Sequence, residues 1–90
     1  MYEWDERKRA ANLRDHGVDF ADAQRFDWET ALVTVDDRED YDELREMAIG
    51  FIGVRLHAMV FTRRADSIRI ISLRKAQRRE VRRYVEGTKG

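Results

Sequence analysis

The chain has 90 residues, a mass of 10.7 kDa and a net charge of zero, and this length is sufficient for one domain. Because the chain contains no cysteine, the sequence excludes disulfide bonds, zinc–thiolate centres and cysteine nucleophiles. Charged residues make up 40% of the chain, but its aromatic and β-branched residues argue against disorder. No apolar run approaches the roughly 18 residues of a membrane span and no charged-then-apolar leader opens the chain, so we expect a cytoplasmic protein.

The charges are divided unevenly between the two halves of the chain. Residues 1–46 contain 15 acidic and 7 basic side chains, whereas residues 47–90 contain 3 acidic and 11 basic ones. Most of the basic residues in the second half are arginines, whose planar guanidinium groups match the geometry of phosphate. This distribution predicts a polyanionic partner for the C-terminal half. The alternative is that the two halves neutralise each other within one small domain.

The first part of the chain contains helix signals. Residues 2–4 are typical of a short edge strand, and Asp5 is an N-cap residue followed by an acidic first turn. We therefore expect a helix over 6–16, ended by Gly17, which is the preferred residue for a left-handed C-terminal position. A second, shorter helix is expected over 20–27, where apolar residues recur at helical spacing.

Four strands are predicted next, over 31–35, 45–52, 54–63 and 68–74. The loop 36–43 between the first two is so rich in charge that we expect it to be solvated. Both faces of the third segment are apolar, which is typical of a central strand. Because the connections are short, the four strands are expected to form an antiparallel meander.

The last predicted element is a helix over 75–86. At ~100° per residue, its basic side chains fall on one side and its apolar side chains on the other. Two helices, a sheet and a final helix indicate an α+β fold. We expect a single domain over 1–86 and a flexible tail over 87–90.

The sequence contains no glycine-rich nucleotide loop, no G-x-S-x-G elbow and no H-E-x-x-H metal motif. The acidic loop 36–43 could attract a hard cation, but such a run is more typical of a solvated surface. We therefore predict no metal and no cofactor.

The basic C-terminal region suits chemistry at a phosphodiester. Cleavage of RNA needs cations around an anionic phosphorane, together with groups that take a proton from the 2′-hydroxyl and give one to the 5′ oxygen. Arg69 and Arg74 lie on the last predicted strand, and the helix over 75–86 adds further arginines. Glu80 and Tyr84 on the same helix are candidates for proton transfer.

Each of these residues also has a structural interpretation. Arg78 and Arg82 can form a solvated helix face, Tyr84 can belong to the core, and Glu80 can pair with an arginine. Arg69 interrupts an apolar strand, which favours a functional role for it.

The two histidines have different surroundings in the sequence. His16 ends the first predicted helix and shares a polar stripe with Lys8 and Asn12, at spacings of four residues. It is a candidate catalytic residue, although a capping role is the alternative. His57 lies in the predicted central strand, which favours a packed, hydrogen-bonded histidine.

Three motifs follow one another along the chain. The first consists of Trp4-Asp5, Lys8, Asn12, His16-Gly17-Val18 and Phe20. The second consists of Tyr41, Glu43, Arg45 and Ala48-Ile49-Gly50. The third consists of Thr62-Arg63, Ile68-Arg69-Ile70-Ile71-Ser72, Arg74, Ala76, Glu80 and Tyr84. In this order and spacing they resemble the BrnT toxin family over almost the whole chain, with one departure at Asp15, where relatives often have a basic residue.

The resemblance implies a RelE-like fold, with an antiparallel sheet of about four strands, a short additional N-terminal strand, two N-terminal helices and one C-terminal helix. It also implies a type II toxin, a metal-independent endoribonuclease that cleaves RNA and arrests growth. The implied partner is a BrnA-like antitoxin with a ribbon-helix-helix DNA-binding domain, through which the complex contacts operator DNA.

The motifs and the basic residues together give a predicted site. The predicted catalytic residues are Arg69, Arg74, Glu80, Tyr84 and His16. The predicted RNA-binding residues are Lys8, Arg63, Arg64, Arg78, Arg79, Arg82 and Arg83. The expected reaction is attack of the RNA 2′-hydroxyl on the adjacent phosphate, which leaves a 2′,3′-cyclic end. The alternative is a non-catalytic regulatory module that binds nucleic acid or the antitoxin.

Overall fold

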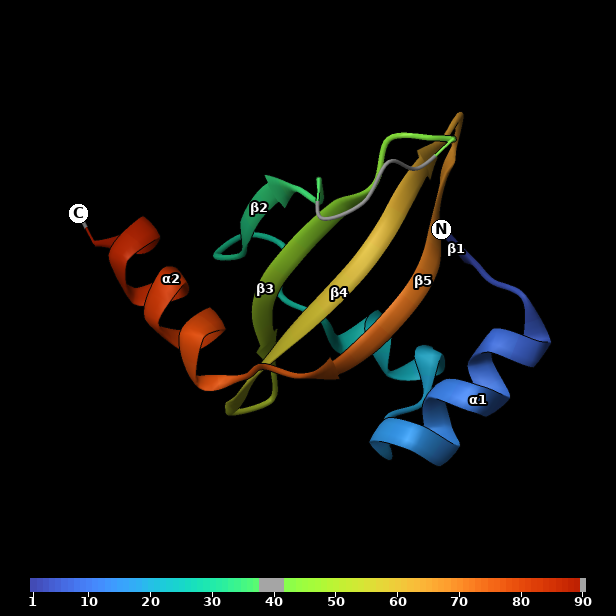
Figure 1. The fold of residues 1–90 in the computed structure, drawn as a ribbon, viewed down its shortest axis with the longest axis horizontal. Coiled ribbons are helices and arrows are strands. Elements are labelled where there is room, and N and C mark those ends of the chain that lie inside the picture. The colour runs from blue at the N-terminus through green and yellow to red at the C-terminus, as the bar shows by residue number, and fades with distance from the viewer. Residues whose placement is uncertain (38–41, 90) are drawn as a thin grey trace.

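A computed structural model of the chain describes residues 1–37 and 42–89. Its elements in chain order are β1 (Tyr2–Glu3), α1 (Glu6–His16), the 3₁₀ helix η1 (Phe20–Arg25), β2 (Leu32–Val35), β3 (Glu46–Ile52), β4 (Arg55–Arg64), β5 (Ser67–Lys75) and α2 (Arg78–Thr88). The strands form one five-stranded sheet in the order β1-β5-β4-β3-β2, with α1 and α2 at opposite ends of the view (Figure 1). The α+β class is therefore confirmed.

Helix α1 has the bounds that the sequence predicts. The Asp5 side chain accepts a hydrogen bond from the Arg7 amide at 2.8 Å and caps the helix. Gly17 ends it with a φ of 71°, a left-handed conformation that glycine adopts without steric cost.

The second predicted helix is present but ends two residues earlier than predicted. Residues Phe20–Arg25 form a 3₁₀ helix capped by Asp19, whereas the prediction extended to residue 27. The helix ends early because Phe26 has an extended backbone and forms an isolated β-bridge with Ile52. Because Phe26 pairs with β3, the helix does not continue beyond Arg25.

The antiparallel meander of four strands is confirmed, with β4 in the centre of the sheet. The ends of β2 and β3 lie where they were predicted, and every other boundary of the four strands differs from its prediction by one residue. The short N-terminal strand ends at Glu3 and pairs in parallel with β5, Tyr2 lying opposite Ile68. The sheet is therefore antiparallel except at this edge.

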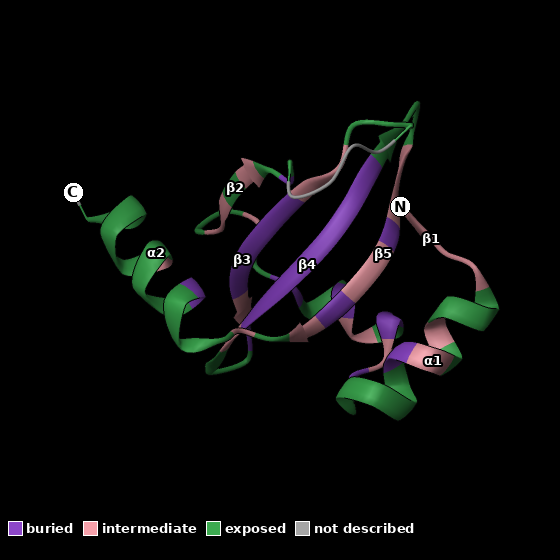
Figure 2. Cartoon of the chain, viewed as in Figure 1, coloured by how far each residue is buried: buried purple, intermediate pink, exposed green. Residues whose placement is uncertain are grey.

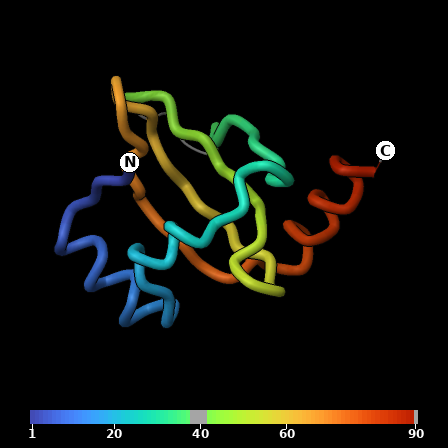
Figure 3. Tube along the Cα trace, turned by 180° about the vertical axis from the view of Figure 1, so that it is seen from behind, coloured from blue at the N-terminus to red at the C-terminus, as the bar shows by residue number. Residues whose placement is uncertain are grey.

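The sheet has two buried faces, as the apolar pattern of β4 predicts (Figure 2). The face packed against η1 contains Val18, Phe20, Ala23, Phe26, Ala48, Ile52, Met59, Phe61, Ile70 and Leu73. The opposite face, called the α2 face below, contains Met47, Ile49, Ala58 and Val60, with Tyr84 packed against them. The view from behind shows α1 and η1 on the side of the sheet nearer the viewer (Figure 3).

A β-bulge in β5 determines which of its side chains lie on each face. Phe61 pairs with Ile70 and Val60 with Ser72, so Ile71 is the extra residue. As a result Ile70 and Leu73 both pack on the η1 side although three positions separate them.

The C-terminal helix is displaced along the chain from its prediction. Lys75 is still paired with His57 in the sheet, and the helix begins at Arg78 rather than at residue 75. Gln77 is the N-cap residue, and the helix continues to Thr88, two residues beyond the predicted end.

The predicted solvated loop over 36–43 is only partly described. Residues 38–41, with the motif residue Tyr41, lie outside the described residues. Asp36 contradicts the prediction because it is buried, and its amide donates to the Arg45 carbonyl at 2.8 Å. Because the backbone pairing of β2 with β3 continues to Asp36, its side chain is buried.

Within the described part of the chain, none of the helices combines the length and the apolar character needed to span a membrane.

Candidate functional site

Arg74 and Glu80 form a largely buried ion pair between β5 and the first turn of α2. The two guanidinium Nη atoms donate to the two carboxylate oxygens at 2.7 and 2.8 Å. The Glu80 side chain is 4% exposed and the Arg74 side chain 16%. The Gln77 amide donates to Glu80 Oε1 at 2.8 Å, so the same carboxylate also caps the helix.

These contacts determine the ionisation of Glu80. Burial on its own would raise the pKa of the Glu80 carboxyl, but hydrogen bonds from Arg74 and the Gln77 amide outweigh it. The pKa of Glu80 therefore lies below its ordinary value, and the side chain is a bound carboxylate at neutral pH. The guanidinium group of Arg74 and the carboxylate of Glu80 are therefore both hydrogen-bonded within the protein.

Tyr84 holds the next turn of α2 against the sheet. Its hydroxyl donates to the Thr30 carbonyl at 3.0 Å, and its ring makes an edge-to-face contact with Phe51 at 5.7 Å. The residue is half-buried, which agrees with the structural interpretation of its apolar side. The geometry of Arg74, Glu80 and Tyr84 is that of residues that position α2.

One side of α2 is strongly basic. Four exposed arginines lie on it, and none has a carboxylate within ion-pair distance among residues 1–37 and 42–89: Arg78, Arg79, Arg82 and Arg83. Their surroundings leave the guanidinium groups available to an anion. This cluster is called the α2 arginines below.

A shallow groove of about 420 Å³ runs between α2 and the edge strand β2. Its lining consists of Leu32, Thr34, Arg79, Arg82, Arg83 and Glu86. An Arg83 Nη atom lies 3.5 Å from the Thr34 hydroxyl, so this arginine reaches across to β2. With three arginines and one glutamate, the groove has a positive charge.

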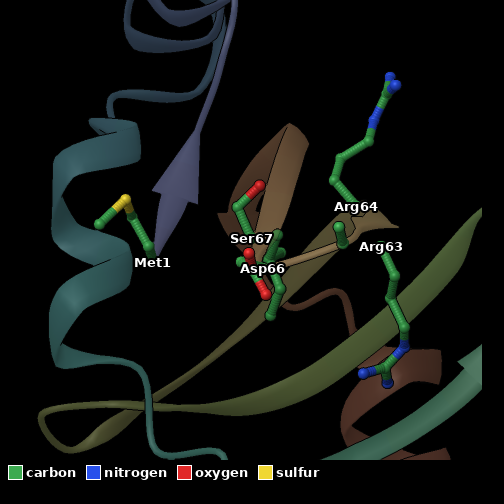
Figure 4. A pocket seen from close by; sticks show the side chains of 7 residues that line it. Met1, Arg63, Arg64, Asp66 and Ser67 are labelled. Carbon is green, nitrogen blue, oxygen red and sulfur yellow. The ribbon is translucent and has the colours of Figure 1, made fainter.

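The remaining predicted cations on the sheet have carboxylate partners. Arg63 Nε lies 2.6 Å from Glu46, and Arg64 lies 3.4 Å from Glu43. The two arginines line a pocket at the β4–β5 turn but point in opposite directions, as neighbouring residues on a strand do (Figure 4). They do not form one phosphate site.

Arg69 has a looser contact than these two. It lies opposite Glu3 in the parallel pair, with the guanidinium 3.6 Å from the carboxylate and a side chain that is 34% exposed. Arg69 and Arg74 directly flank Ile70 and Leu73, which face η1, so both arginines point to the α2 face.

His16 and Lys8 are exposed on α1, which lies at the other end of the molecule from α2 in both views (Figure 1 and Figure 3). The structure therefore does not bring them together with the α2 arginines. His57 is buried, with Nδ1 at 2.9 Å from the Arg55 carbonyl, which agrees with the packed histidine that the sequence favours.

Asn12 is a buried residue whose role the sequence did not reveal. Its amide nitrogen donates to the carbonyls of Val18 at 2.9 Å and Leu73 at 2.6 Å. Its side-chain oxygen accepts from the Leu73 amide at 3.1 Å. Asn12 thus binds the outer backbone edge of β5, where β1 no longer pairs with it. The only signal in the sequence was its place in the first motif.

In the part of the chain that the structure describes, no group of three or more carboxylate, histidine or cysteine side chains is placed to hold a metal ion.

A family model described as "Ribonuclease toxin, BrnT, of type II toxin-antitoxin system" matches residues 4–80. The match extends from the residue before the α1 cap to Glu80 in the first turn of α2, and so includes Arg69 and Arg74. The comparison with curated proteins gave no match. Because the family model covers most of the chain, the protein belongs to the BrnT family of ribonuclease toxins of type II toxin–antitoxin systems.

Proposed function

We propose that the protein is a metal-independent endoribonuclease whose α2 arginines bind the phosphates of RNA. The family supplies the class of reaction. The observation that supports the location is the group of four exposed arginines on α2 without carboxylate partners among the described residues. Arg69 on the same face of the sheet provides a further cation for the RNA backbone.

The proposed reaction needs no metal in its balance. The 2′-hydroxyl oxygen forms a bond to phosphorus and its proton passes to water. The bond from phosphorus to the 5′ oxygen breaks, and that oxygen takes a proton from water. The guanidinium groups stabilise the charge that develops on the phosphorane, where one such contact is typically worth ~100- to 1000-fold in rate. The products are a 2′,3′-cyclic end and a 5′-hydroxyl.

Three of the predicted catalytic residues receive a different role in this proposal. Arg74, Glu80 and Tyr84 have their polar groups bound within the fold, and we assign them to positioning α2. His16 and Lys8 lie on α1, so the proposal does not place them at the α2 arginines.

The experiment is an assay of the purified protein with RNA in the presence of EDTA. We expect cleavage to continue, with products that carry 2′,3′-cyclic phosphate. Cleavage that EDTA abolishes would contradict the metal-independent reaction, and intact RNA would contradict the nuclease itself. Expression of the chain alone in a bacterium is expected to arrest growth.

The proposed partner is an antitoxin of the BrnA type with a ribbon-helix-helix domain, through which the complex contacts operator DNA in the cytoplasm. A type II toxin family implies an antitoxin in general. Co-expression with such a protein is expected to restore growth.

A second candidate function is a regulatory module that binds RNA or the antitoxin without catalysis. The occupied polar groups of Arg74, Glu80 and Tyr84 favour this candidate, since the residues expected to transfer protons are engaged elsewhere. RNA affinity that falls with salt, without any cleavage product, would support this module and not the enzyme.

A further inference from the structure

The two edges of the sheet differ in how their backbone is protected. At one edge, β1 covers the first part of β5, and the Asn12 side chain binds both the amide and the carbonyl of Leu73. At the other edge lies β2 (Leu32–Val35), which among residues 1–37 and 42–89 has a partner strand on one side only. An uncovered edge strand presents unpaired backbone groups to other chains.

The register shows which backbone groups of β2 point outward. The Asp36 amide donates to the Arg45 carbonyl, so in the antiparallel ladder Thr34 and Leu32 also direct their backbone groups to β3. The amides and carbonyls of Val33 and Val35 therefore point away from the sheet. No backbone hydrogen bond from these two residues to another element occurs among the described residues.

The strand is short, at four residues, but it lacks the other features that usually protect an edge. Residues 31–37 contain no lysine and no proline, and the side chains of Val33 and Val35 are 37% and 57% exposed. Figure 2 shows β2 in the colours of intermediate and exposed residues beside the buried strand β3. The side chains of β2 on the η1 side are thus exposed, whereas Leu32 and Thr34 on the α2 side are half-buried.

The two faces of the edge differ in chemistry. On the η1 side lie the exposed side chains of Val33 and Val35. On the α2 side lies the basic groove, where Arg79 and Arg83 stand beside Leu32 and Thr34. A sixth strand added here would place alternate side chains in these two environments.

We propose that the outer edge of β2 binds an extended segment of the antitoxin by strand addition. The segment has apolar side chains beside Val33 and Val35 and acidic side chains, at the alternate positions, facing Arg79 and Arg83. The inference rests on the proposed function in one respect. If the α2 arginines bind RNA as proposed, a partner bound at this edge neutralises them.

A second copy of the chain fits this edge poorly. Its own β2, with the sequence Leu-Val-Thr-Val, supplies no acidic side chain for the groove. A symmetric pair of β2 strands would also bring two sets of α2 arginines to one side of the joined sheet, where like charges repel. Charge complementarity therefore favours an acidic partner segment.

The test uses the full chain and a seven-residue peptide that alternates glutamate and valine. We expect the peptide to slow hydrogen exchange of the Val33 and Val35 amides. We also expect it to bind about 10-fold more tightly than a peptide of the same composition with its glutamates in one block. Equal affinity for the two peptides, or unprotected β2 amides, would overturn the proposal.

Two variants at one position separate the backbone contact from the side chain. Val35→Pro removes an outward amide without removing a bond to β3, and we expect it to weaken peptide binding about 10-fold or more. Val35→Thr keeps the amide and the β-branched shape, and we expect it to retain most of the affinity. Hydrogen exchange of β4 amides checks that both variants are folded. Equal affinities of the two folded variants would contradict strand addition.

The groove is tested by charge reversal. The double variant Arg79→Glu and Arg83→Glu should lose the glutamate peptide and bind a matched peptide that alternates lysine and valine. If the double variant still prefers the glutamate peptide, the proposal that acidic side chains of the segment face Arg79 and Arg83 is overturned. Protection of the β2 amides by an RNA oligonucleotide in place of the peptide would also overturn it, as would concentration-dependent protection of the chain alone.

The outcomes also distinguish this inference from the proposed function. Val35 does not belong to the proposed RNA surface, so Val35→Pro should cleave RNA at the wild-type rate while losing the peptide. A wild-type protein that binds the peptide but leaves RNA intact would contradict only the nuclease. One that cleaves RNA but leaves β2 unprotected would contradict only the strand addition.

Discussion

At the scale of single residues, burial decides the role of the polar side chains. The spacing of Asn12 from Lys8 and His16 placed it on a polar stripe with them, but Asn12 is buried and binds the backbone of β5. Its Leu73 partner atoms lie 61 residues away and belong to the main chain, which has no signature in the sequence. By contrast, the Asp5 cap was predictable because its hydrogen bond spans only two residues.

The substitution Asn12→Ala is expected to destabilise the protein by roughly 2–3 kcal/mol. It removes three hydrogen bonds, each worth ~1 kcal/mol net, and leaves the Leu73 backbone unpaired in the interior. Urea unfolding measures the difference. The matched control is Lys8→Ala on the exposed side of the same helix, which should change stability by less than ~0.5 kcal/mol. Similar values for the two variants would contradict the assigned role of Asn12.

Two carboxylates make the free energy of unfolding depend on pH in the acidic range. The pKa of Glu80 lies below its ordinary value of 4.5, and Arg9 lowers the pKa of Asp19 from 3.8 to about 2. Because a lowered pKa means that the folded state binds fewer protons, this stability is complete above the ordinary values and is lost as the pH falls through the lowered ones. Unfolding free energies should therefore decrease below about pH 4.5.

The variant Glu80→Gln tests the contribution of Glu80. It should be less stable than the wild type at pH 7 and lose less of its stability between pH 5 and pH 3, since the glutamine cannot be protonated. Denaturant unfolding at a series of pH values makes the comparison. Parallel pH profiles of the variant and the wild type would show that Glu80 titrates normally.

At the scale of elements, α2 shows what periodicity can and cannot predict. The exposed arginines agree with the basic side that the spacing of residues 75–86 predicts, but Val81 and Val85 of the predicted apolar side are exposed as well. The start of the helix could not be predicted from the spacing, because Lys75 pairs with His57 in the sheet and Gln77 and Glu80 form the cap. The bidentate ion pair of Arg74 with Glu80 forms because the turn between β5 and α2 brings the two side chains together. The spacing of the residues alone does not predict the geometry of that turn.

Removal of two α2 arginines should reduce the salt dependence of RNA binding. For the double variant Arg78→Ala and Arg82→Ala, the slope of log affinity against log salt should fall by ~1.4, since each contact with single-stranded RNA contributes ~0.7. Fluorescence anisotropy with a labelled oligonucleotide gives the slope. The double variant Arg14→Ala and Arg25→Ala removes the same charge from exposed positions elsewhere and should keep the wild-type slope. Equal slopes in both double variants would place the RNA away from α2.

At the scale of the whole molecule, the charge asymmetry of the sequence has two outcomes. Part of it is neutralised between the halves, by pairs such as Arg63 with Glu46 and Arg64 with Glu43, as the alternative interpretation required. The α2 arginines keep the rest of it at one end of the molecule. The meander was predictable from short connections, whereas the parallel pairing of β1 with β5 joins distant residues and was not.

The single-turnover rate of RNA cleavage tests the central claim most directly. The double variant Arg79→Ala and Arg83→Ala should cleave RNA at least ~100-fold more slowly than the wild type, because it lacks two groups proposed to stabilise the phosphorane. The matched variant Arg14→Ala and Arg25→Ala should cleave at the wild-type rate. Equal rates for the two double variants, with both proteins folded, would contradict the assignment of the RNA-cleaving surface to α2.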